Sequence, residues 1–133
     1  MTLGYSDKIL PYPAVQYIPL NINTKSFKRN WDNSYPIKLH IFNNLTKAEQ
    51  TLRFYSINLP NKINLNNKLL LLLINAKADD IFYRGYKTKI IGNKTNNSYH
   101  LFTIPAQYFY KKDLIFNFFL PSGEKMLTEN IKL

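Results

Sequence analysis

The stretch KLLLLLI, residues 68–74, constrains the fold more than any other part of this sequence. It is far shorter than the roughly 20 apolar residues that a helix needs to cross a bilayer. An amphipathic surface helix would carry polar residues on one side, and this run has none. A short apolar run between turn-forming residues is typical of a strand buried on both faces. We therefore predict a central strand of a β-sheet here.

Other short segments are also predicted to be strands, and the alternation of apolar and polar residues that is typical of half-buried strands occurs in 35–42, 51–57 and 81–91. The predicted segments, each bounded by turn-forming residues, are 14–22, 35–42, 51–57, 81–91, 99–104, 113–120 and 126–133. Within 81–91, Gly85 predicts a bulge or a close approach of two backbones. Residues 79–80 and 92–98 are predicted to lie in turns. A single helical turn is expected within 44–52.

Eight short strands with so little helix predict an all-β fold, an antiparallel β-sandwich of about seven or eight strands. The length of 133 residues fits one domain. Residues 14–133 are predicted to form the sandwich, and residues 1–13, with two prolines, an extended N-terminal tail or arm. Leu71 and Phe116 are predicted to be buried in facing or neighbouring central strands.

The residue types speak against catalysis. The chain has no cysteine, which excludes disulfides and thiolate metal sites. Its four glycines make a phosphate-binding loop improbable. His40 and His100 have no third ligand at metal-site spacing, and no nucleophile motif is present. We predict that the protein is not an enzyme and needs no metal or cofactor.

The chain is strongly basic, with 18 Lys and Arg against 8 Asp and Glu and a net charge of +10. Such a charge favours acidic protein surfaces, RNA or anionic lipids as partners. An Asn-, Lys- and Ile-rich composition also arises from AT-rich coding, so compositional background is the alternative. No signal peptide is visible, which fits an internal protein or the mature form of an exported one. Lipid-anchored or peripheral association and the oligomeric state are left open.

One segment combines aromatic rings and cations as binding surfaces do. Rings for stacking and cations for phosphates or carboxylates are interleaved within residues 82–94. Trp31 is a second candidate, as an anchor at a partner interface. The candidate partner-binding residues are Tyr83, Arg84, Tyr86, Lys87, Lys89, Lys94 and Trp31.

Two segments, YPIKLHIFNNLTKAEQTLRFY and LIFNFFLPSGEKMLTENIKL, have a strand–turn–strand layout. This layout resembles that of immunoglobulin-like and transthyretin-like sandwich modules. Such modules serve as assembly subunits, including small outer-membrane lipoproteins of type VI secretion machines. The resemblance implies a non-enzymatic interaction or assembly module within a larger complex, and the net charge predicts an acidic protein surface as its partner. A basic RNA-binding subunit of a ribonucleoprotein and a carbohydrate-binding sandwich are the alternatives.

Overall fold

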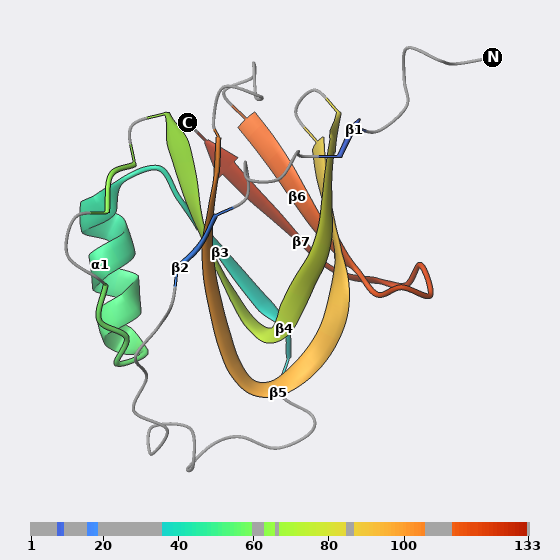
Figure 1. Cartoon of the computed structure of the whole chain (residues 1–133), viewed down its shortest axis with the longest axis horizontal. Coiled ribbons are helices and arrows are strands. Elements are labelled where there is room, and N and C mark those ends of the chain that lie inside the picture. Colours follow the sequence, from blue (N-terminus) through green and yellow to red (C-terminus); the bar gives the residue numbers. More distant parts are fainter. Residues whose placement is uncertain are drawn as a thin grey trace.

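The computed structural model describes residues 8–9, 16–18, 36–59, 63–65, 67–84, 87–105 and 113–132. In chain order these residues form β1 (Lys8–Ile9), β2 (Gln16–Ile18), β3 (Lys38–Phe42), α1 (Leu45–Phe54), β4 (Lys68–Arg84), β5 (Lys87–Pro105), β6 (Asp113–Phe119) and β7 (Lys125–Lys132). The seven strands belong to one mixed sheet that is nearly closed into a barrel (Figure 1). The all-β prediction is therefore confirmed, whereas a two-sheet sandwich and an immunoglobulin-like arrangement are not.

The centre of the fold is a long antiparallel hairpin made by β4 and β5. Both strands bend sharply near their middle, so the hairpin is folded into a U (Figure 1). We call the half formed by residues 68–74 and 99–105 the first arm. The half formed by residues 80–84 and 87–91 is the second arm. The two arms provide opposite walls of the barrel.

The remaining strands extend these two arms. In the first arm β3 pairs with β4, and β2 pairs with β5. In the second arm β1 pairs with β4, and β6 runs parallel to β5. Strand β7 then pairs with β6 in the antiparallel sense and approaches β3, which nearly closes the barrel.

The bend of the hairpin depends on two irregular positions. Asn75 has a left-handed backbone with φ of 63° at a shift in the strand register, a conformation that asparagine tolerates better than most residues. Its side-chain amide donates a hydrogen bond of 3.1 Å to the carbonyl of Pro36. On the opposite strand, Gly92 lies directly against the backbone of Lys77. Both positions let β4 and β5 turn without separating.

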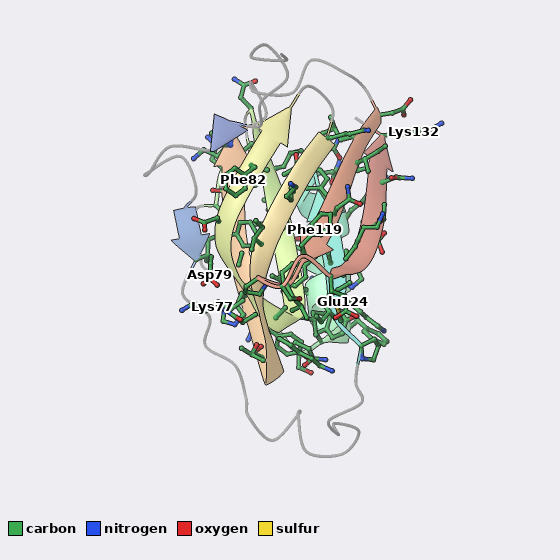
Figure 2. All side chains as sticks on the ribbon, turned by 90° about the vertical axis from the view of Figure 1, so that its right-hand side faces the viewer. Lys77, Asp79, Phe82, Phe119, Glu124 and Lys132 are labelled. Atoms are coloured by element: carbon green, nitrogen blue, oxygen red, sulfur yellow. The ribbon has the colours of Figure 1, made fainter. Side chains whose placement is uncertain are left out.

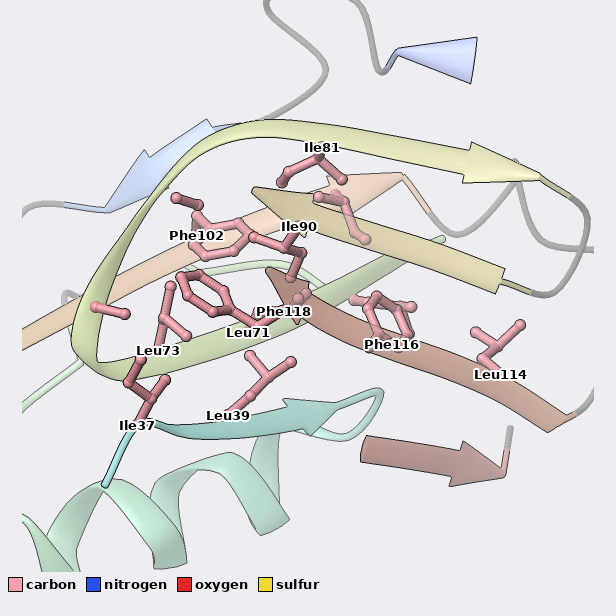
Figure 3. Packing of buried hydrophobic residues seen from close by; sticks show 14 residues of the cluster. Ile37, Leu39, Leu71, Leu73, Ile81, Ile90, Phe102, Leu114, Phe116 and Phe118 are labelled. Atoms are coloured by element: carbon pink, nitrogen blue, oxygen red, sulfur yellow. The ribbon is translucent and has the colours of Figure 1, made fainter. Parts of the chain in front are cut away.

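Residues 68–74 are buried on both faces, as predicted, and the two faces contact different parts of the protein. Leu69, Leu71 and Leu73 point into the barrel, where large rings from β5 and β6 fill the space (Figure 3). Leu71 and Phe116 belong to this interior cluster and are fully buried, as predicted. Fully burying one such side chain contributes about 1.5–3 kcal/mol.

The other face of the first arm is covered by α1. Leu70, Leu72 and Ile74 pack against Ala48 and Leu52 of the helix. These two helix residues are four apart and therefore lie on the same helix face. The side chain of Asn44 caps the helix by accepting a hydrogen bond of 3.1 Å from the backbone N–H of Lys47.

This helix corrects the prediction of a strand at 51–57. Residues 51–54 belong to α1, and the expected single helical turn is a helix of ten residues. The alternation of Leu52 and Phe54 suggested a strand, but Leu52 is buried while Phe54 is 82% exposed. The spacing from Ala48 to Leu52 is what determines the buried face.

The prediction of one continuous strand over 81–91 is also wrong. Residues 81–84 end β4 and residues 87–91 begin β5, with Arg84 paired to Lys87; Gly85 itself lies outside the described residues. Residues 79–80 and 92–98, predicted as turns, belong to the two strands. The polar residues in these segments lie where the strand pairing is irregular at the bend. The sequence of such a segment looks the same as that of a turn.

Other predicted segments agree with the structure. Strands occur within 35–42, 99–104, 113–120 and 126–133, while 14–22 is described only at residues 16–18. Of the predicted tail 1–13, only β1 is described, and it pairs with β4. The described part of the chain contains no helix long and apolar enough to cross a membrane.

Candidate functional site

The structure brings together only two of the predicted binding residues whose side chains it describes. Lys87 and Lys89 lie two residues apart at the start of β5, and Lys94 lies further along, at the bend, opposite Ala76. The backbones of Tyr83 and Arg84 belong to β4, but their side chains are not among those described. Tyr86 and Trp31 lie outside the described residues.

The direction of Lys87 and Lys89 follows from the alternation of β5. Thr88 and Ile90 are buried, and Ile90 belongs to the interior cluster. Lys87 and Lys89 must therefore point away from the barrel. The two lysines therefore share one face of the sheet, as residues two apart on a strand do.

Neighbouring strands add apolar side chains to the same outward side of the second arm (Figure 2). Phe82 of β4 is opposite Lys89, and the parallel pairing with β6 places Ile115 beside Lys87 and Asn117 beside Lys89. We call this surface the outer face. It consists of Phe82, Lys87, Lys89, Ile91, Ile115, Asn117 and Phe119.

Two contacts order the centre of the outer face. The Nζ atom of Lys89 lies 5.5 Å from the centroid of the Phe119 ring, a cation–π geometry that contributes about 0.5–1 kcal/mol at an exposed site. The hydroxyl of Thr128 on β7 donates a hydrogen bond of 2.6 Å to Oδ1 of Asn117. The cation and the amide are therefore held in defined positions on a sheet rather than on a loop.

The lysines and aspartates at the margins of the outer face balance one another, so its excess of positive charge comes from Lys87 and Lys89 on the middle strand. Lys125 and Lys132 of β7 are exposed next to β6. Asp80, opposite Ile91, and Asp113, opposite Lys132, are the nearby acids. Together with Lys87 and Lys89, four lysines therefore accompany two aspartates along this side of the sheet.

A second cluster of polar and aromatic groups lies under α1, but its contacts are structural. Nε2 of His40 is 3.1 Å from the hydroxyl of Tyr55, and Tyr55 also contacts the ring of Tyr99. Burial lowers the pKa of His40, and repulsion from Lys38 lowers it further. In the described residues no group of three His, Asp or Glu side chains could hold a metal ion.

The histidines predict a pH dependence of stability. Burial, together with the charge of Lys77, also lowers the pKa of His100. As the pH falls below about 6.5, the unfolded chain gains histidine protons before the folded protein does. The contribution of the two histidines to the free energy of unfolding should therefore be fully present above that pH and be lost as the pH falls below it, as measured by urea unfolding. The variant His40→Gln/His100→Gln should flatten this decrease, and an unchanged slope would contradict the assignment.

Fold and site together define an all-β protein with a barrel-like sheet and a basic, partly apolar outer face. Comparison of the chain with known protein families, curated protein sequences and solved structures found no match. The functional argument therefore depends on the residues of the outer face.

Proposed function

We propose that this protein is a non-enzymatic interaction or assembly module that binds an acidic protein surface through the outer face. The observation that carries the proposal is the combination of Lys87 and Lys89 with half-buried apolar side chains from three neighbouring strands. Apolar contacts supply affinity, and charge complementarity supplies partner selection and a fast association rate. A link to immunoglobulin-like or transthyretin-like assembly subunits stays a prediction.

RNA is the second candidate, and the rings support it. Phe82 and Phe119 lie among lysines, which is how sheet surfaces combine base stacking with phosphate contacts. Asp80 and Asp113 border the same surface and would repel an acidic protein and a phosphate backbone alike, so these two acids do not distinguish the candidates. Aliphatic Ile91 and Ile115 offer no ring for stacking. A carbohydrate partner stays a prediction without support from these residues.

The double variant Lys87→Glu/Lys89→Glu tests the role of the outer face. We expect the fold to be kept, with a loss of stability within about 1 kcal/mol, because Lys87 is exposed and the cation–π contact of Lys89 is a small term. Binding to an acidic partner should weaken severalfold and become less sensitive to salt. The matched control is Lys38→Glu/Lys47→Glu, which changes the net charge equally at exposed positions on β3 and α1.

Photo-crosslinking identifies the class of partner. A photoreactive amino acid in place of Asn117, expressed in the source cells, should yield a crosslink to a protein. That crosslink should disappear in the Lys87→Glu/Lys89→Glu background and persist in the control. A crosslink to RNA, or a protein crosslink that both double variants retain equally, would contradict the proposal.

A further inference from the structure

The dimensions of the outer face specify what kind of acidic partner fits it. We infer that its occupant is an amphipathic helix of a partner protein, with carboxylates four residues apart between two rows of apolar side chains. This inference rests on the proposed function and adds the shape and the charge spacing of the ligand.

The width of the outer face favours a helix. Its side chains come from β4, β5 and β6, which are adjacent in the sheet. Neighbouring strands lie about 4.8 Å apart, so the outer two of three strands are separated by roughly 10 Å. A helix with its side chains is about 10–12 Å across. One helix therefore covers all three strands, whereas one extended chain would cover only one.

The order of side chains across this width also fits a helix. The cations Lys87 and Lys89 are on the middle strand, with Phe82 on one side and Ile115 and Phe119 on the other. Two residues along a strand span about 6.6 Å, and four residues along a helix span about 6 Å. Glutamates at positions i and i+4 would thus face the two lysines. Apolar residues on either side of the glutamates would contact the flanking rings and aliphatic groups.

The same sheet already packs against a helix elsewhere. On the first arm, α1 covers the outward face with Ala48 and Leu52, which are four residues apart. In the described part of the chain no helix covers the second arm. Figure 1 shows α1 on the left, beside the first arm, and no helix on the opposite side of the sheet. A sheet face with apolar side chains is stabilised by a layer of this kind. A helix supplied by a partner would cover the second arm as α1 covers the first, with its acidic side chains next to the lysines.

Designed peptides test the inference directly. The first is a helix-forming peptide of about 15 residues, roughly four turns, with glutamates at i and i+4 flanked by leucines. The second has the same composition, with glutamates at i and i+2 in a strand-like alternation. We expect the first to bind the full-length protein at least severalfold more tightly in fluorescence anisotropy. Equal affinity of the two peptides would overturn the inference.

A charge-reversal experiment supplies the specific control. Lys87→Glu/Lys89→Glu should weaken binding of the glutamate helix severalfold, and a peptide with lysines at the same positions should regain binding to this variant. The Lys38→Glu/Lys47→Glu control should keep binding of the original peptide. Failure of the lysine peptide to regain affinity would overturn the pairing, as would an oligouridine that displaces the helix at lower concentration. If no helix binds but the Asn117 protein crosslink still requires the two lysines, the helix inference fails while the proposed function stands.

Discussion

Replacing Gly92 by alanine is expected to lower the free energy of unfolding by about 3 kcal/mol, the upper end of the usual cost of adding atoms to a packed site. A Cβ atom at this position would lie far inside the van der Waals contact distance of the carbonyl oxygen of Lys77. That oxygen belongs to the backbone of β4 at the bend of the hairpin, so it cannot move without disturbing the pairing of Lys77 with Asn93. Urea unfolding followed by circular dichroism measures the change.

Gly123 provides the matched control. It lies in the turn between β6 and β7 with φ of +94°, and a Cβ there would meet no atom within 4 Å. Gly123→Ala therefore carries only the cost of a left-handed backbone, about 1–2 kcal/mol. If Gly92→Ala were no more destabilising than Gly123→Ala, the close approach of β4 and β5 would not be a tight constraint.

The sequence was most informative where one segment is buried on both sides. The run at residues 68–74 has no polar position, which correctly indicated a central strand. It did not indicate that Leu71 faces the barrel interior while Leu72 faces a helix. That division depends on α1, whose capping residue Asn44 was a usable signal. The alternation around Leu52 and Phe54 concealed the helix.

The bend of the hairpin could not be predicted from local sequence. Residues 79–80 and 92–98 have turn-like composition, yet they continue two strands through shifts in register. What keeps them in the sheet is the pairing of residues far apart in the chain, such as Lys77 with Asn93. A turn and a bulge use the same residue types, because both require departures from regular strand geometry.

Local sequence could predict only the part of the outer face that lies on β5. Period-2 alternation was enough to place Lys87 and Lys89 on one side of a strand. Their neighbours Ile115, Asn117 and Phe119 come from β6, which pairs with β5 in parallel. A parallel pairing needs a long connection and leaves no local signal. The apolar residues at alternate outward positions in DLIFNFF were the one available indication that this strand has two apolar faces.

Phe116→Ala is expected to lower the free energy of unfolding by about 3–5 kcal/mol. Phe116 is fully buried in the interior cluster, and pairs across β5 with Thr88. Interior side chains from both arms and β6 surround it (Figure 3). Removing the ring would leave a cavity that strands fixed on both sides cannot fill by collapsing.

The neighbouring residue Ile115 separates a cavity effect from a general effect on β6. Its side chain is half-buried on the outer face, so Ile115→Ala exposes some apolar area without making a cavity, at a cost of about 1 kcal/mol. Leu71→Ala on the opposite wall should cost about 2–5 kcal/mol. Chemical denaturation of the three variants ranks them. Near-wild-type stability of both Phe116→Ala and Leu71→Ala would mean that the two arms do not enclose a common core, because a filled barrel cannot lose a ring from one wall and a leucine from the other without cost.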